Sequence, residues 1–322
     1  MALFWLCDRT PYFERSAKAY SRDFFWFLWG ILVLIGLLSI RECHQPASSV
    51  TKGTGTGTGV LSKALDSRHV QPLQRDQTEE WKGWMQVMFL LYHYFEAKEL
   101  YNAIRIYIAA YVWMTGFGNF SYYYVKADFA LTRFCQMMWR LNFLCFFCCM
   151  VLQNDYMLYY ICMLHTAFTV FIYVTLGISY SVNTTTAGIA VKFAAVTSVV
   201  LAIWHIPGAF DIFWWPWRWL ALYKGSMHEW FFRSTLDHLV WIVGMATAFF
   251  FPNMDGCLAR VEALAVSHRS FIKVSVVALA LLLMRFYYTA VFSLDKYAYN
   301  TLHPYTSWYV LHFACCACRS FV

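Results

Sequence analysis

Long apolar runs of membrane-spanning length dominate this sequence and restrict the folds open to it. One of them, FFWFLWGILVLIGLLSI at 24–40, contains no charged residue. A run of ~17–25 apolar residues is long enough to cross the hydrocarbon core of a bilayer as an α-helix. The apolar-out, polar-in alternation of a membrane β-barrel is missing from the sequence. The sequence therefore predicts an all-α fold, a polytopic bundle of membrane helices.

We expect about eight membrane-embedded segments in one domain that covers residues 1–322. The expected segments are 24–40, 81–95, 101–124, 133–152, 156–178, 189–210, 228–251 and 271–294. The composition agrees, because 60% of the residues are hydrophobic and only 13% are charged, whereas soluble domains contain ~25% charged residues. Residues 41–80 form the one long polar segment and include GTGTGTG at 53–59, which predicts a flexible loop.

Two motifs within the apolar runs predict interruptions of helices. Gly116 and Gly118 predict a break or kink late in segment 101–124. The Pro207–Gly208 pair predicts a kink in another helix or the end of it. The tryptophan-rich stretch after that pair predicts an interfacial or re-entrant segment, because tryptophan prefers the headgroup zone.

The charge pattern indicates which partners to expect. The formal net charge is +7, but the 25 basic residues are scattered and form no block. No RNP motif, zinc finger or basic arm is present, so nucleic acid is not an expected partner, whereas membrane lipid is. Cys145 and Cys148 have the spacing of a redox or metal pair. Without a second pair or histidines at ligand spacing, packing is favoured and no metal is expected.

Two histidines, His93 and His165, interrupt apolar segments. Ionisable groups at membrane depth are costly and often functional. An imidazole titrates near neutrality, so either histidine is a candidate general base or proton shuttle. A histidine that only hydrogen-bonds a neighbouring helix would give the same pattern, and the residues alone leave both interpretations open.

Three cations stand in or beside apolar segments: Lys82, Arg105 and Arg140. The planar guanidinium group suits phosphate and carboxylate, so the two arginines are candidates to grip a phosphorylated donor. Structural salt bridges, or snorkelling to a helix end, are the alternative. Lys82 begins the same segment as His93 and is a third candidate for substrate binding.

A further set of charges lies at four-residue spacing in segment 228–251. Glu229, Arg233 and Asp237 share one helical face there. The pattern favours a stabilising charge ladder over chemistry, but Asp237 is kept as a candidate substrate-binding residue. Asp211 follows the Pro207–Gly208 pair, and His303 directly precedes Pro304. Both are weaker candidates at loop edges.

Several long motifs resemble the plant reduced-wall-acetylation proteins. That family belongs to a wider group of membrane acyltransferases with the fungal capsule O-acetylation proteins and the vertebrate sialate O-acetyltransferases. The motifs are RDQTEEWKGWMQ (75–86), YNAIRIYIAAYVWMTGFGNFSYYYVKADF (101–129), RFCQMMWRLNF (133–143), HEWFFRSTLD (228–237) and LHPYTSW (302–308). Family members are longer and do not end in FACCACRSFV, so we expect a truncated or divergent member.

The resemblance implies O-acetylation of cell-wall polysaccharides at the Golgi membrane. Acetyl groups from cytosolic acetyl-CoA would pass through the membrane to sugar acceptors in the lumen. On this hypothesis His93 or His165 is the base or acyl carrier, Arg105 and Arg140 hold the coenzyme phosphates, and these side chains converge on one cavity. Two alternatives remain open. One is a transporter that moves acetyl-CoA or acetyl groups to supply separate lumenal polysaccharide O-acetyltransferases, and the other is an inactive, truncated membrane scaffold.

Overall fold

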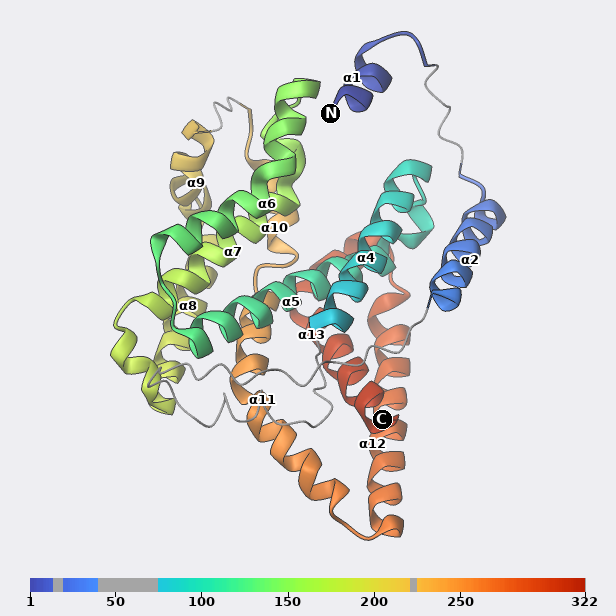
Figure 1. The fold of residues 1–322 in the computed structure, drawn as a ribbon, viewed down its shortest axis with the longest axis vertical. Helices are drawn as coiled ribbons and strands as arrows, with labels where there is room; N and C mark the ends of the chain where they lie inside the picture. The colour runs from blue at the N-terminus through green and yellow to red at the C-terminus, as the bar shows by residue number, and fades with distance from the viewer. Residues whose placement is uncertain (14–19, 40–74, 221–224, 322) are drawn as a thin grey trace.

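The computed structural model of the chain describes residues 1–13, 20–39, 75–220 and 225–321, which form helices and, within these ranges, no strand. The helices are α1 (Ala2–Arg9), α2 (Arg22–Leu38), α4 (Arg75–Phe95), α5 (Tyr101–Lys126), α6 (Leu131–Leu152), α7 (Tyr160–Gly177), α8 (Thr186–His205), α9 (Ala209–Leu220), α10 (His228–Thr235), α11 (Val240–Glu262), α12 (Val266–Tyr287) and α13 (Lys296–Phe321). The all-helical membrane bundle predicted from the sequence is confirmed (Figure 1).

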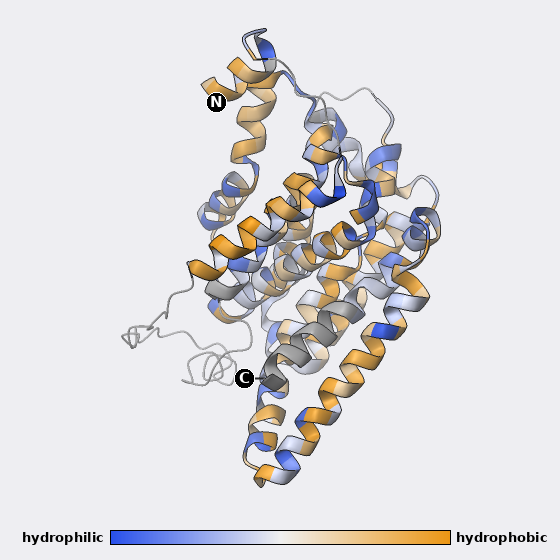
Figure 2. Cartoon of the chain, turned by 90° about the vertical axis from the view of Figure 1, so that its right-hand side faces the viewer, coloured by the Kyte–Doolittle hydropathy of each residue, from blue (hydrophilic) through white to orange (hydrophobic). Residues whose placement is uncertain are grey.

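Among the described residues, 5 stretches are long and apolar enough to cross a membrane: Leu131–Leu152, Tyr156–Gly177, Thr186–His205, His228–Glu262 and Val266–Phe292. The three other segments expected, 24–40, 81–95 and 101–124, correspond to α2, α4 and α5. Figure 2 shows that α2 and α12 present a mostly hydrophobic surface to one side of the molecule. Leu34 of α2 and Leu282 of α12 are 55% and 67% exposed. A large exposed apolar surface of this kind suits contact with lipid.

The polar loop expected at 41–80 lies mostly outside the described residues. Its predicted end is wrong, because α4 already begins at Arg75. The sequence places Asp76, Glu79 and Glu80 in the first two turns of that helix. Acidic residues near a helix N-terminus stabilise the helix through its dipole. The local charge pattern therefore extends the helix into the stretch that composition alone assigns to a loop.

The centre of the bundle is the crossing of α5 and α11, where two glycines let the backbones touch (Figure 1). A Cβ atom added at Gly116 would overlap the backbone oxygen of Trp241. A Cβ atom added at Gly244 would likewise overlap the backbone oxygen of Trp113. Small residues allow this close approach, and close packing is a main source of helix association in lipid. The crossing therefore requires glycine at both positions.

The glycines of α5 do not interrupt that helix, contrary to the sequence prediction. α5 runs without a break from Tyr101 to Lys126. Gly116 is needed for the approach of α11, whereas a Cβ atom at Gly118 would meet nothing within 4 Å. A glycine in a membrane helix is thus explained here by a neighbouring helix and not by a kink.

The break predicted near Gly208 is confirmed. α8 ends at His205, and Gly208 has a φ of 80°, in the left-handed region that glycine adopts readily. In α9, which follows, Trp214 is buried while Trp215 and Trp219 are 65% and 69% exposed. α9 thus has one buried and one exposed tryptophan face, and its position at a membrane interface stays a prediction.

The crossing of α5 and α11 can be tested with a pair of glycine substitutions on one helix. Gly116→Ala forces the two backbones apart, and we expect it to lower the stability by about 1–3 kcal/mol, as overpacking does. Gly118→Ala is the matched control, because open space surrounds that position. The measurement is thermal unfolding of the purified chain in detergent, followed by tryptophan fluorescence. Equal midpoints for the two variants would contradict the assigned contact.

Candidate functional site

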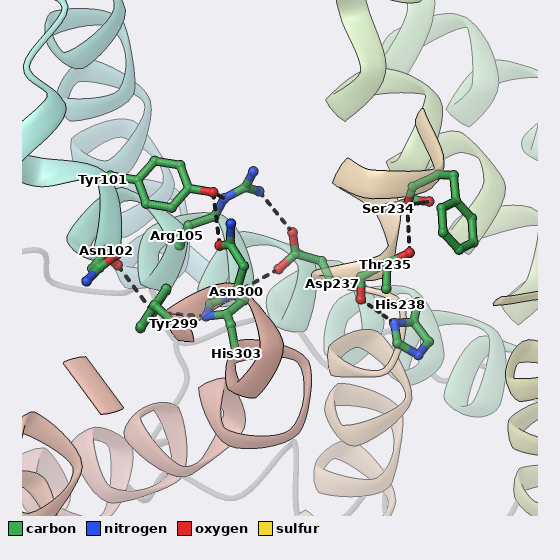
Figure 3. A network of polar contacts seen from close by, with 11 residues as sticks. Tyr101, Asn102, Arg105, Ser234, Thr235, Asp237, His238, Tyr299, Asn300 and His303 are labelled. Carbon is green, nitrogen blue, oxygen red and sulfur yellow. Dashed lines mark hydrogen bonds and ion pairs between the residues drawn. The ribbon is translucent and has the colours of Figure 1, made fainter. Parts of the chain in front are cut away.

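Three ionisable residues from distant parts of the chain meet inside the bundle (Figure 3). Arg105 comes from the start of α5, Asp237 from the turn between α10 and α11, and His303 from α13. Their exposed fractions are 4%, 1% and 0%. Asp237 Oδ2 lies 3.8 Å from Arg105 Nη1, and Asp237 Oδ1 lies 3.5 Å from His303 Nε2. One buried carboxylate therefore lies between two groups that can carry positive charge.

The arginine of this network is held by its own helix. Arg105 Nε donates a hydrogen bond of 3.2 Å to the hydroxyl of Tyr101, one turn earlier. The Tyr101 hydroxyl in turn donates to Asn300 Oδ1 of α13, at 3.0 Å. The guanidinium carbon lies 5.4 Å from the centre of the Tyr101 ring, within the range of a cation–π interaction. Tyr101 thus fixes the orientation of the guanidinium group and links α5 to α13.

The histidine of the network is fixed from its other side. His303 Nδ1 lies 2.9 Å from the hydroxyl of Tyr299, which donates to the backbone oxygen of Asn102 at 3.3 Å. Its Nε2 faces the carboxylate of Asp237. An N–H on Nε2 is favoured there, because a lone pair would be repelled by the carboxylate. At 3.5 Å the two groups are in close polar contact without a hydrogen bond.

The network retains unused hydrogen-bonding capacity. Both carboxylate oxygens of Asp237, Nη1 of Arg105 and Nε2 of His303 are buried and make no hydrogen bond to the described residues. Their separations of 3.5 and 3.8 Å exceed the usual N–H···O range of ~2.7–3.2 Å. Buried polar atoms are nearly always hydrogen-bonded. Their capacity suits a small polar group such as a substrate hydroxyl.

His165 of α7 is a second buried group with a defined hydrogen-bond state. Its Nδ1 lies 2.9 Å from the hydroxyl of Thr115, and that hydroxyl donates its single hydrogen to the backbone oxygen of Tyr111 at 3.1 Å. The Thr115 oxygen must therefore accept from His165 Nδ1–H. In the neutral ring the lone pair then lies on Nε2, which is buried and has no partner among the described residues. A fixed imidazole with a free lone pair is the arrangement of a general base.

The surroundings of His165 connect it to two other candidates. Asp237 and Lys82 both exert an electrostatic influence on the ring, Asp237 the larger one. Lys82 pairs with Glu79 at 3.3 Å, and its side chain is 26% exposed. One turn later in α4, the Gln86 amide donates to the hydroxyl of Tyr111, whose ring packs edge-on against His165. A hydrogen bond and a ring contact thus link the Gln86 turn of α4 to His165, while Asp237 pairs with Arg105.

The two other sequence candidates lie elsewhere. His93 is exposed, and its ring packs against Phe89 and Tyr92 of its own helix at 4.5 and 5.1 Å between centroids. Arg140 is also exposed, on α6. The structure does not bring these two side chains into the network around Arg105. The expected convergence of His93, Arg105 and Arg140 on one cavity is therefore not seen.

His303 is the functional candidate that the sequence most underestimates. The following Pro304 suggests a loop edge, yet both residues lie within α13. Polar residues recur there at helical spacing, namely Tyr299, His303 and Ser307, and all three are fully buried. That spacing is the signal that identifies an inward polar face. Within the described ranges, no group of three histidine, cysteine or acidic side chains is placed to hold a metal ion.

Comparison with known proteins identifies related sequences. The model of a family described as the 10 TM acyl transferase domain found in Cas1p matches residues 58–317, a range that contains every candidate discussed above. The N-acetylneuraminate (7)9-O-acetyltransferase of Danio rerio is 30% identical over 264 residues, which cover 78% of this chain and 31% of that protein. The chain thus spans less than a third of the length of this relative. No solved structure matches the chain.

The buried ion pair can be tested by removing one partner, which leaves the other charge buried without a counter-charge. Asp237→Ala leaves Arg105 buried without a counter-charge, and we expect a loss of about 3–5 kcal/mol in stability. Replacing both partners, in Arg105→Met with Asp237→Leu, removes the stranded charge and should restore most of that loss. Both variants are measured by thermal unfolding and by the yield of monodisperse protein. A double variant no more stable than Asp237→Ala would contradict the pairing.

Proposed function

Since this chain belongs to the family of the 10 TM acyl transferase domain found in Cas1p, we propose that it transfers acetyl groups from acetyl-CoA to sugar hydroxyls. The proposed acceptors are cell-wall polysaccharides in the Golgi lumen, as the sequence resemblance implies. The matched relative from Danio rerio is named for O-acetylation of a sugar, N-acetylneuraminate, which supports a sugar hydroxyl as acceptor. Lumenal polysaccharide O-acetyltransferases are the proposed partners.

The observation that carries this proposal is the free Nε2 of His165. Acetyl transfer to a hydroxyl requires a base that removes the hydroxyl proton while the oxygen attacks the thioester carbonyl carbon. His165 Nε2 is buried and has no hydrogen-bond partner among the described residues, and the Thr115 hydroxyl beside Nδ1 favours the tautomer with its lone pair on Nε2. The same nitrogen then returns the proton to the departing coenzyme thiolate as the carbon–sulfur bond breaks. Atoms and charges balance with no further reactant.

The charged neighbours of His165 have separate roles in this proposal. Lys82 acts electrostatically on the ring and lies at a partly exposed position. Its ammonium group would stabilise the negative charge that develops on the carbonyl oxygen. Arg105 and Asp237 would bind the acceptor through their unused hydrogen-bonding capacity. An aspartate and an arginine together offer both an acceptor and a donor to the hydroxyl groups of a sugar.

His165→Asn tests the base directly. The asparagine amide can keep the donor to Thr115, but it has no basic nitrogen in place of Nε2. We expect acetyl transfer to fall by about 10²–10⁴-fold, the usual contribution of a general base. The assay uses the full chain in liposomes, with radiolabelled acetyl-CoA supplied outside and acceptor polysaccharide enclosed.

The matched control is His268→Asn, because His268 is exposed on α12. It should transfer acetyl groups at the rate of the unaltered protein. If His165→Asn transfers acetyl groups at the normal rate, His165 is not the general base. If the unaltered protein carries the label across the membrane but leaves the polysaccharide unlabelled, the chain is a transporter and not a transferase.

A further inference from the structure

Arg140 is a charged side chain in an apolar helix, and the proposed acetyl transfer at His165 gives it no role. It lies nine residues after the start of α6, a helix of 22 residues in which only 11% of the most apolar stretch is buried. Its side chain is exposed and makes no hydrogen bond or ion pair with the described residues. An arginine that faces hydrocarbon at this depth is among the costliest groups in a membrane helix. Arg140 therefore needs a partner that the described residues do not supply.

Arg140 belongs to a row of polar residues, here called the cationic stripe, which consists of Arg133, Gln136 and Arg140. Their spacing of three and four residues places them on one face of α6, and all three are exposed. The two arginines lie two turns apart, ~10 Å along the helix axis. The stripe thus presents two guanidinium groups and an amide in a line toward the outside of the bundle.

One end of the cationic stripe is held in place. Arg133 Nε donates to the hydroxyl of Tyr122 at 3.0 Å, and its guanidinium carbon lies 5.4 Å from the centre of that ring. Tyr122 donates to Asp128 Oδ2 at 3.1 Å. These contacts orient Arg133 while its two Nη groups keep their hydrogens available. The opposite end of α6 is occupied by α1, whose Arg9 bonds to the backbone oxygen of Leu152 (Figure 1).

The same face of α6 becomes apolar beyond Arg140. Phe143, Leu144 and Met150 are 45%, 57% and 62% exposed. Trp139, beside the stripe, is 54% exposed. The N-terminal half of this face therefore contains two cations, and its C-terminal half is apolar. This is the pattern that a phosphate headgroup and its acyl chain would match.

We propose that this face of α6 binds an anionic phospholipid, with its phosphate at the cationic stripe and an acyl chain along the apolar half. Guanidinium groups bind phosphate through paired, charge-assisted hydrogen bonds. The apolar half favours a lipid over a soluble phosphate compound such as the coenzyme. A second copy docked symmetrically through this face would place Arg140 against Arg140, and like charges repel strongly where the dielectric is low.

The test is binding of fluorescent phosphatidic acid to the purified full chain in neutral detergent. Arg140→Gln and Arg133→Gln should each weaken binding by about tenfold, the loss expected for one hydrogen bond between charged groups. Phosphatidylcholine, which has no net charge, should not compete. Because Arg140 makes no hydrogen bond or ion pair with the described residues, Arg140→Gln should leave the thermal unfolding midpoint unchanged, which separates a binding defect from misfolding.

Arg260→Gln is the matched control, since Arg260 is exposed on α11, outside the stripe, and it should bind the probe as the unaltered protein does. Unchanged affinity of Arg140→Gln would overturn the proposal. Displacement of the probe by free coenzyme A would also overturn it, because the phosphate would then come from a nucleotide. The measurement needs no acetyl transfer, so its outcome is independent of the role of His165.

Discussion

The backbone contact between α5 and α11 decides whether the buried charges of this protein can meet. Hydrocarbon surrounds a membrane bundle, so burying apolar side chains between helices gives little net stabilisation, and close packing must supply it. Gly116 and Gly244 make that packing possible at the crossing. Arg105 lies on the first of these helices, and Asp237 lies three residues before the start of the second. A wider crossing would separate two charges that are too costly to leave buried alone.

The resulting ion pair is loose, and its looseness has a structural cause. Arg105 is tied to Tyr101 and His303 to Tyr299, so each basic side chain is positioned by a tyrosine and not by the carboxylate between them. Asp237 is therefore near two donors without a hydrogen bond to either. A tight, bidentate arginine–aspartate pair would be more stable but would have no capacity left for a ligand. The arrangement gives up pair strength and keeps polar atoms available inside an apolar bundle.

The sequence predicts the fold class well because membrane thickness imposes a length on every apolar run. It predicts the inward face of each helix poorly, and the two candidate histidines illustrate why. His93 and His165 both stand in apolar segments, yet His93 is exposed and His165 is buried, with only 4% of its surface accessible. When nearly every residue around a histidine is apolar, the pattern contains no polar face to indicate its direction. Only the packing of the other helices distinguishes them. The role of Gly116 cannot be predicted locally for the same reason, since it depends on Trp241, which is remote in the sequence.

Arg105 and Arg140 extend this argument to the energetics of the membrane. Both interrupt apolar segments, and their local sequences would support the same function. α5 is enclosed by the bundle, so Arg105 meets a carboxylate and a tyrosine from the protein itself. α6 lies at the edge, so Arg140 meets whatever surrounds the protein. The cost of a charge at membrane depth applies to both residues, but the source of the compensating group differs. Charged residues in membrane helices therefore need not converge on one cavity, because a peripheral helix can satisfy its charge with lipid phosphate while a central helix requires a protein partner.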